Sequence, residues 1–195
     1  GVDNFLAKQD HFQTIPQAII DTIRLSAKPE ETGIPKLASF SGKTVQELFK
    51  RVPKIIASAV RAVHVEGETG TGKEVLADLF QAALGPKVPF LRINCGAIQP
   101  NLVESELFGH VKGAFTGAHT DKIGLFEAAS GGWLFADEIG LLPPHAQRSV
   151  LRAIENQEVV RLGDHRRRKI NVRIISATNE ALEKSVADGR FRRDL

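Results

Sequence analysis

A glycine-rich segment between a predicted strand and a predicted helix constrains the fold of this chain more than any other feature. Residues 67–73 read Gly-Glu-Thr-Gly-Thr-Gly-Lys and fit the G-x-x-x-x-G-K part of a P-loop. Ala62–Glu66, before them, has the pattern of a short strand. After them, apolar residues recur at helical spacing, at Val75, Leu76, Leu79, Phe80 and Ala83. A strand that leads through such a turn into a helix is typical of α/β folds.

Predicted strands and helices continue to alternate from Phe40 onward. Further apolar strands are expected at Pro89–Asn94, Trp133–Asp137 and Val172–Ala177. Further helices are expected over residues 45–52, ending near Pro53, and around Val150, Leu151 and Ile154. Strands this apolar are typical of a parallel sheet that is covered on both faces. We therefore expect an α/β fold with a parallel central sheet flanked by helices.

The bulk composition is that of a soluble globular domain. The chain has 195 residues, 42% hydrophobic and 25% charged, which allows one domain plus a short extension. A net charge of +3 is too small to indicate nucleic-acid binding by the whole domain. Cys95 is the single cysteine, which fits a reducing compartment. No apolar run approaches a bilayer span and no signal sequence is present, so we expect a cytoplasmic protein without membrane contact.

The first 39 residues differ in character from the rest of the chain. A helical stripe of isoleucines, at Ile15, Ile19, Ile20 and Ile23, is followed by the linker-like run Lys28–Pro35. We interpret residues 1–39 as a helix and linker from an upstream region. Residues 40–195 then form the α/β domain.

The glycine-rich segment predicts a phosphate-binding site. Its glycines allow backbone N–H groups to point at phosphate oxygens, and Lys73 would neutralise the outer phosphates. The nucleotide-binding residues expected are Gly67, Glu68, Thr69, Gly70, Thr71, Gly72, Lys73 and Glu74. Glu74 stands where a P-loop usually has a Ser or Thr hydroxyl ligand for Mg²⁺. The alternative interpretation is a glycine-rich turn with a solvated lysine.

An acidic pair ends the predicted strand Trp133–Asp137. Acids at the carboxyl end of a parallel strand lie where α/β sheets bind ligands. Asp137 is expected to hold Mg²⁺, mostly through water, and Glu138 to polarise the attacking water. The alternative is a strand followed by a helix-capping acid.

A second glycine-flanked segment identifies a family. It reads Gly113-Ala114-Phe115-Thr116-Gly117-Ala118 and follows Glu104-Ser105-Glu106-Leu107-Phe108-Gly109-His110. Its glycines indicate a turn or loop tip that carries an apolar ring, and an ordinary glycine-rich turn is the alternative. The stretch resembles the GAFTGA loop of the bacterial enhancer-binding proteins, AAA+ ATPases that remodel RNA polymerase carrying sigma-54. In that family the Phe and Thr of the loop contact the sigma factor.

The resemblance implies roles for further residues. Asn94 matches an asparagine that hydrogen-bonds the catalytic glutamate, and Asn179, after Thr178, matches sensor I. Arg192 matches the first arginine finger, which reaches the nucleotide of a neighbouring subunit, so the active form is expected to be a ring, most simply a hexamer. Each asparagine alone also fits a turn after a strand, and Arg192 alone fits a solvated basic turn.

The resemblance also includes a hairpin, with Glu158–Leu162 and Lys169–Asn171 joined through Gly163-Asp164. It matches the second pore loop of the family. Its basic run, His165–Lys169, is either solvated or a nucleic-acid contact. Leu125 and Trp133 depart from the family pattern, in which Arg and a smaller residue are common.

The family's helical lid, second finger and helix-turn-helix lie outside the matched motifs, so contact with promoter or enhancer DNA is expected through a domain outside this chain. The expected function is Mg²⁺-dependent ATP hydrolysis that remodels closed promoter complexes of sigma-54 RNA polymerase. Two alternatives remain open. One is a nucleotide-binding module without autonomous turnover, and the other is a P-loop kinase or NTPase of another class.

Overall fold

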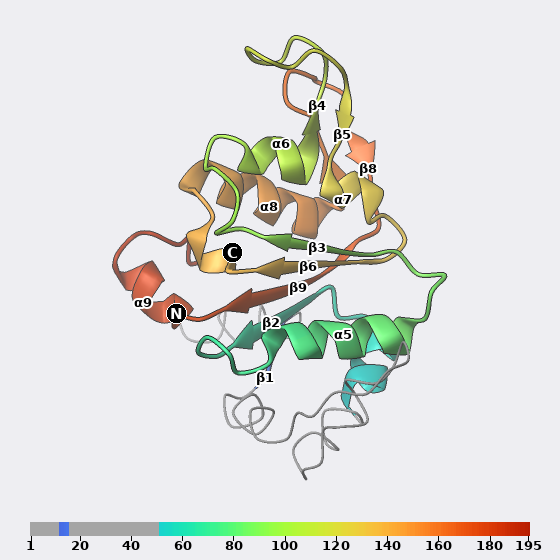
Figure 1. The fold of residues 1–195 in the computed structure, drawn as a ribbon, viewed down its shortest axis with the longest axis vertical. Coiled ribbons are helices and arrows are strands. Elements are labelled where there is room, and N and C mark those ends of the chain that lie inside the picture. Colours follow the sequence, from blue (N-terminus) through green and yellow to red (C-terminus); the bar gives the residue numbers. More distant parts are fainter. Residues whose placement is uncertain (1–11, 16–50) are drawn as a thin grey trace.

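A parallel sheet forms the centre of the molecule in the computed structural model, which describes residues 12–15 and 51–195. Its strands lie in the order β1-β2-β9-β6-β3, and every pairing between them is parallel (Figure 1). Their bounds are β1 Phe12–Ile15, β2 Ala62–Glu66, β3 Phe90–Asn94, β6 Trp133–Asp137 and β9 Arg173–Thr178. The predicted α/β fold is confirmed, and the four strands predicted from the sequence differ from the observed ones by at most one residue at either end.

Helices cover both faces of this sheet. One face carries α5 (Lys73–Leu84) and a helix over residues 51–57 (Figure 1). The other face carries α6 (Val103–Phe108), α7 (Leu125–Ala128) and α8 (Pro144–Asn156). Short elements complete this part of the chain: η2 (Ile139–Leu141) after β6 and α9 (Leu182–Ala187) after β9.

Two expectations about the N-terminal part of the chain were wrong. Ile15, expected in a helix, ends strand β1, whose partner is β2. The helix expected to end near Pro53 continues to residue 57. Proline has a helical φ and can be accommodated where its missing N–H is not needed, so it need not end a helix. Ile19, Ile20 and Ile23, with residues 45–50, lie outside the described residues.

Strand β6 shows how the two layers share the sheet. Trp133 and Phe135 point into the cluster under α5, whereas Leu134 and Ala136 point into the cluster under α8. All four are at most 3% exposed. A strand buried on both faces needs apolar residues at successive positions, which explains its apolar run. Trp133 packs against Phe80 of α5 with ring centres 5.5 Å apart, so this departure from the family pattern has a packing role.

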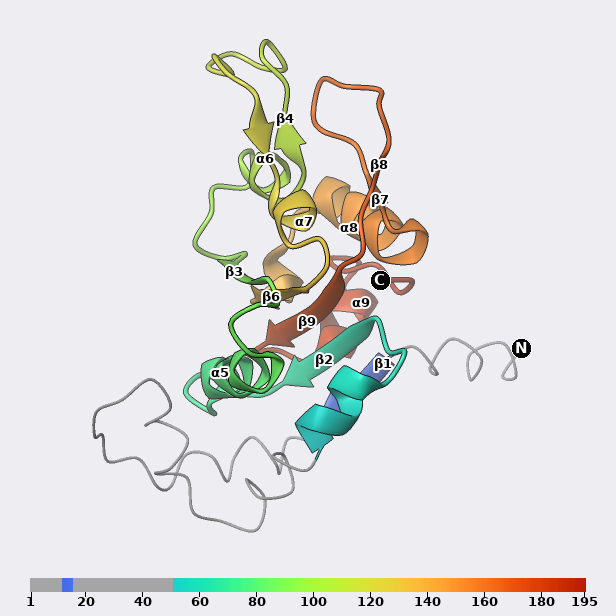
Figure 2. The same cartoon turned by 90° about the vertical axis from the view of Figure 1, so that its right-hand side faces the viewer.

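Two short hairpins project away from the sheet, beyond the helices of the α8 face (Figures 1 and 2). The first pairs β4 (Gly109–His110) with β5 (Lys122–Ile123), and the second pairs β7 (Glu158–Val159) with β8 (Arg168–Lys169). Both pairings are antiparallel. The hairpin predicted at Glu158–Asn171 is therefore confirmed, although each strand has only two residues. Among the helices of the described part, none is long and apolar enough to cross a bilayer.

Candidate nucleotide site and loop pair

The carboxyl ends of four strands bring the predicted site residues to one edge of the sheet. Asn94 at the end of β3 is in register with Asp137 at the end of β6. The Gly67 N–H, just after β2, donates to the Thr178 carbonyl at the end of β9, at 3.0 Å. This edge is where ligands bind in open parallel α/β sheets.

The glycine-rich segment folds tightly between β2 and α5. Gly70 and Gly72 have φ values of 80° and 91°, which L side chains rarely adopt. Thr71 is fully buried, and its hydroxyl donates to the Glu68 carbonyl at 2.8 Å. The helix α5 begins directly after Gly72, so its N-terminal N–H groups lie at the loop.

The Lys73 ammonium lies inside the curve of this loop. Its Nζ donates to the carbonyls of Gly67, at 2.6 Å, and Glu68, at 2.9 Å, and the residue is only 9% exposed. The alternative of a solvated lysine is therefore wrong. Glu74, in the first turn of α5, is exposed, and an acid there is favoured by the helix dipole.

The acidic pair has an uncommon backbone. Asp137 Oδ1 accepts a hydrogen bond from the Glu138 N–H at 2.9 Å. Glu138 has φ 52° and ψ 43°, a left-handed conformation that costs about 1 kcal/mol or more for a residue other than glycine. Such backbone strain occurs preferentially at functional sites. The alternative of a helix-capping acid finds no support, because no side-chain hydrogen bond caps η2.

Gly96 brings the side chains of Glu138 and Asn94 together. A β-carbon on Gly96 would lie 2.1 Å from Glu138 Oε2 and 3.3 Å from Asn94 Oδ1, so a side chain there would push the carboxylate out of this position. Asn94 Oδ1 accepts from the N–H groups of Gly96, at 2.8 Å, and Ala97, at 3.1 Å. Among the described residues, no hydrogen bond joins Glu138 and Asn94. The two side chains, expected from the family resemblance to be hydrogen-bonded, are therefore adjacent but not bonded in this structure.

The polar residues Thr178 and Asn179, at the end of β9, lie in different surroundings. Thr178 is buried, and its hydroxyl exchanges hydrogen bonds with the backbone of Glu180, at 3.2 Å from the N–H and 3.1 Å to the carbonyl. This closes the turn. Asn179 is exposed at the same edge of the sheet as Asp137.

Arg192 lies in the segment after α9. Its guanidinium forms a forked pair with Asp194, with Nε at 2.8 Å from Oδ1 and Nη2 at 2.6 Å from Oδ2. This pair and its charge raise the pKa of Arg192. The Arg192 N–H donates to Gln147 Oε1 at 2.9 Å. Gln147 was not singled out in the sequence, because two of its three hydrogen-bond partners, Arg190 and Arg192, lie far away along the chain.

The glycine-flanked loop, Gly113–Ala118, lies at the end of the hairpin formed by β4 and β5. Gly113 and Gly117 have φ values of 83° and 103°. The Gly113 N–H donates to the Ala118 carbonyl at 2.8 Å, which closes the loop. Phe115 is 38% exposed and Thr116 is also exposed, as expected for a loop tip. The Phe115 ring meets the His110 ring edge-on, with centres 5.0 Å apart.

His110 is in turn held by a hydrogen bond to α6. Its Nδ1 shares a hydrogen bond of 2.8 Å with the Ser105 hydroxyl, and both residues are buried. Ser105 and His110 both lie in residues 104–110, before the loop, but their spacing in the sequence did not predict this hydrogen bond. The contact ties the loop ring to α6.

The two hairpins are joined at their bases. Leu162 lies beside His110 in a parallel bridge, with its N–H 2.9 Å from the Gly109 carbonyl and its carbonyl 3.0 Å from the Val111 N–H. Arg161 adds a forked pair to Glu127 of α7, at 2.9 and 2.7 Å. The Arg161 hydrogen bond lowers the pKa of Glu127, which keeps the pair charged. Neither connection was predicted from the sequence.

The basic run of the second hairpin is partly used within the hairpin. Arg168 pairs with Asp164 at 2.7 Å, and Arg167 lies 3.8 Å from Glu158. Backbone N–H bonds from Arg166, then the Arg168 side chain, lower the pKa of Asp164 to about 2. His165, Arg166, Arg167 and Lys169 are exposed, as expected for a solvated run, and a nucleic-acid contact by this run stays a prediction.

The single cysteine of the chain is a core residue. Cys95 is 3% exposed, and burial, together with the charges of Asp137 and Glu138, raises its pKa to about 12. Cys95 is therefore a small buried hydrophobe and not a candidate nucleophile. Leu125 packs, partly buried, against the same apolar cluster.

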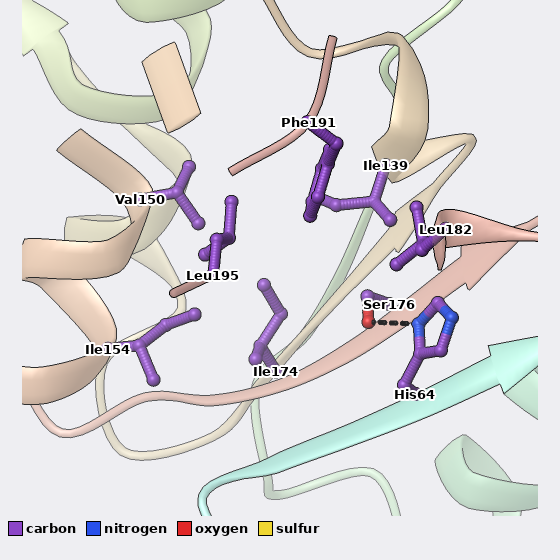
Figure 3. Close-up of a pocket in the computed structure, with 9 residues that line it drawn as sticks. All are labelled: His64, Ile139, Val150, Ile154, Ile174, Ser176, Leu182, Phe191 and Leu195. Carbon is purple, nitrogen blue, oxygen red and sulfur yellow. Dashed lines mark hydrogen bonds between the residues drawn. The ribbon is translucent and has the colours of Figure 1, made fainter. Parts of the chain in front are cut away.

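An apolar cavity of about 190 Å³ lies on the α8 face of the sheet (Figure 3). Phe191 and Leu195 close it from the C-terminal segment, and His64 and Ser176 lie on the strand side. His64 Nδ1 shares a hydrogen bond of 2.9 Å with the Ser176 hydroxyl, while its buried Nε2 has no partner. Burial lowers the pKa of His64 to about 4, so this ring is neutral at physiological pH.

Known proteins are similar to this chain in sequence and in fold. A family model described as the sigma-54 interaction domain matches residues 39–195. The chain is 41% identical over 196 residues to the transcriptional regulatory protein GlrR of Escherichia coli (strain K12), covering 100% of this chain and 44% of that protein. It is 51% identical over 141 residues to the sigma54-dependent transcriptional activator SfnR of Pseudomonas putida, covering 72% of this chain and 38% of that protein.

Solved structures of NtrX from Brucella abortus share the fold. The complex with ADP superposes with a TM-score of 0.68 at 32% identity, over 81% of this chain and 34% of that chain. The complex with ATP gives 0.67 at 33% identity, over 79% and 33%. This chain thus spans less than half the length of these relatives. On these matches the chain belongs to the sigma-54-dependent transcriptional activators, through their sigma-54 interaction domain.

Proposed function

We propose that this chain hydrolyses ATP with Mg²⁺ and uses the energy to remodel closed promoter complexes of sigma-54 RNA polymerase. The observation that carries the proposal is that one domain contains two separate structural features, a P-loop and a projecting hairpin. A P-loop with its lysine held inside lies at the sheet edge beside an acidic pair. A hairpin with a half-exposed aromatic tip projects from the opposite layer (Figure 2).

The nucleotide would bind at the P-loop. Backbone N–H groups of the loop and of the first turn of α5, with the Lys73 ammonium, would face the phosphates, in place of the carbonyl contacts that Lys73 makes here. Relatives of known structure bind ADP and ATP, which supports this assignment. Asp137 fits a Mg²⁺ site, because a carboxylate oxygen is a ligand that this ion prefers. In the described residues, Asp137 included, no three acidic, His or Cys side chains form a metal cluster, so phosphate and water would complete the shell.

Water activation would fall to Glu138. Its strained backbone aims the carboxylate at the space beside Asn94, where it can accept a proton from water. Asn94 would orient that carboxylate, and Asn179 would lie near the terminal phosphate. The bound ion would supply charge neutralisation at the phosphates.

Arg192 would act on the nucleotide of a neighbouring subunit. Its pair with Asp194 holds the guanidinium on the surface of the same chain, so the pair would open when the neighbour docks. A finger that works in trans requires a ring, and we propose a hexamer. A nucleotide-binding module without turnover is the second candidate, favoured by this closed Arg192–Asp194 pair. ATPase activity that rises with protein concentration would exclude it.

The sigma-54 contact would be made by the loop Gly113–Ala118. Phe115 offers an exposed ring on a glycine-flanked tip, and large aromatics dominate protein contacts. Thr116 lies exposed beside it. Promoter or enhancer DNA would be bound by a domain other than residues 40–195, and the protein would work in the cytoplasm. Residues 1–39 would belong to an upstream region except for β1, Phe12–Ile15, which pairs with β2 in the central sheet.

The test uses two substitutions in the full-length protein. Lys73→Ala should abolish ATP binding, because the outer phosphates lose the motif cation. Glu138→Gln should keep ATP binding and lose hydrolysis, because an amide cannot take a proton from water. Equilibrium binding of a fluorescent ATP analogue and phosphate release measure the two steps. Normal hydrolysis by Glu138→Gln would show that the catalytic assignment is wrong.

A further inference from the structure

Gln147 of α8 joins two segments that are distant in the sequence. Its side chain is fully buried. Nε2 donates to the Leu142 carbonyl at 2.7 Å and to the Arg190 carbonyl at 2.8 Å, while Oε1 accepts from the Arg192 N–H at 2.9 Å. Both amide hydrogens and the amide oxygen are thus satisfied by backbone.

Each of the two segments leads to a residue of the proposed chemistry. Leu142 follows η2, which begins directly after Glu138. Arg190 and Arg192 flank Phe191, which is buried in the core under α8. One carboxamide therefore hydrogen-bonds to both the turn that follows the acidic pair and the backbone of the proposed finger.

The two sides depend on Gln147 to different degrees. The turn after Glu138 is also closed by its own backbone, with the Leu141 N–H 2.9 Å from the Glu138 carbonyl. In the finger segment, the Arg190 carbonyl and the Arg192 N–H have Gln147 as their hydrogen-bonding partner. A movement of the turn would either carry the finger segment with it or leave a buried amide group unpaired, which costs about 1–3 kcal/mol.

We propose that Gln147 is a positioning residue that sets Arg192 for its action on the neighbouring subunit and links it to the turn after Glu138. The inference rests on the proposed function, because it needs a finger that works in trans. Gln147 would contact no nucleotide. It would act only through the backbone of Arg190 and Arg192.

The chain offers a matched control at the other end of α8. Gln157 Nε2 donates to the carbonyls of Ile154, at 3.0 Å, and Val172, at 3.2 Å, while its Oε1 accepts from the Val172 N–H at 2.8 Å. The pattern of two carbonyls and one N–H is the same. None of the Gln157 partners lies in the finger segment or beside the acidic pair.

The experiment compares Gln147→Glu with Gln157→Glu in the full-length protein. Each change keeps the shape of the side chain and replaces two donors by an acceptor that faces carbonyls. Because loss of an arginine finger costs about 10³-fold or more in turnover, misplacing it in Gln147→Glu should lower kcat by at least about tenfold. KM for ATP should change little, and Gln157→Glu should keep near-normal turnover. Equal activity of the two variants would overturn the inference.

Mixed rings separate positioning from general damage. Lys73→Ala subunits cannot bind ATP but keep a normal finger, so mixing them with Gln147→Glu subunits should raise hydrolysis well above that of either variant alone. Mixing Gln147→Glu with Arg192→Ala should restore none. Absence of rescue in the first mixture would mean a structural defect within the subunit, and would overturn the inference. If Gln147→Glu does not fold, Gln147→Met enters the same mixtures.

The same preparations distinguish failure of this inference from failure of the proposed function. If Arg192→Ala alone hydrolyses ATP normally, the finger assignment is wrong and the inference falls with it. If Arg192→Ala is inactive while Gln147→Glu is normal, only the role of Gln147 is refuted.

Discussion

Gly163 of the second hairpin lies directly against Ala114 of the first. A β-carbon on Gly163 would come within 2.7 Å of the Ala114 β-carbon and 3.0 Å of its α-carbon. Because one of these atoms is backbone, the contact cannot be relieved by a side-chain rotation. Gly163 also has φ 76°, so glycine is required there both for space and for conformation. Together with the Leu162 bridge, this contact makes the two loops one unit.

Gly163→Ala should therefore disturb the loop without disturbing the nucleotide site. We expect ATP binding to remain and retention of sigma-54 by the ADP–aluminium fluoride state to fall. Gly85→Ala is the matched control, because Gly85 has φ 77° but no atom within 4 Å of an added β-carbon. Native gel co-migration with sigma-54 measures the effect. Equal retention by both variants would mean that the loop contact has no part in sigma-54 binding.

Phe115→Ala and Thr116→Ala should separate hydrolysis from remodelling. Phe115 is 38% exposed and contacts His110, not the P-loop, so ATP hydrolysis should stay within a few-fold. Sigma-54 binding and promoter melting should be lost, because an apolar anchor is removed. Ile123→Ala, at a residue 58% exposed on β5 of the same hairpin, is the control and should melt promoters normally. Normal melting by Phe115→Ala would refute the remodelling proposal.

His64 should make the fold less stable in mild acid. Burial lowers its pKa from 6.5 to about 4, so below pH 6.5 the unfolded chain binds a proton that the folded chain does not. The free energy of unfolding should thus fall as the pH drops from 6.5 to 4, by up to about 3 kcal/mol. Urea unfolding across this range measures it, with His64→Asn as the control. An equally steep fall in His64→Asn would assign the loss to other groups.

Cys95 should be protected from alkylation in the folded protein. Its pKa is raised from 9.0 to about 12, which reduces the thiolate fraction near pH 8 by about a thousandfold, and the sulfur is buried as well. Iodoacetamide should modify it only in denaturant, and since Cys95 is the single cysteine, intact mass reports this site alone. Labelling of the native protein at the denatured rate would contradict the buried position.

The sequence by itself determined the elements whose signals are local. Ala62–Glu66 and the glycine-rich turn before α5 were predicted at their observed positions, because a P-loop needs its strand, glycines and lysine in succession. The apolar runs of β6 and β9 predicted buried parallel strands, since such strands need apolar residues on both faces. The same locality made Asp137 and Glu138 recognisable as a pair at a strand end.

Only the tertiary structure decided the features that depend on distant partners. From the sequence we expected Ile15 in a helix and a helix that ends near Pro53. Both expectations were wrong, because the pairing of β1 with β2 and the packing of residues 51–57 against the sheet depend on residues far away along the chain. The hydrogen bond between Gln147 and Arg192 and the Gly163–Ala114 contact each join residues more than forty positions apart. Asn94 and Glu138 meet through the space that Gly96 leaves, and the structure shows them adjacent without a hydrogen bond. Local pattern specifies backbone conformation, whereas the meeting of side chains depends on how the layers pack.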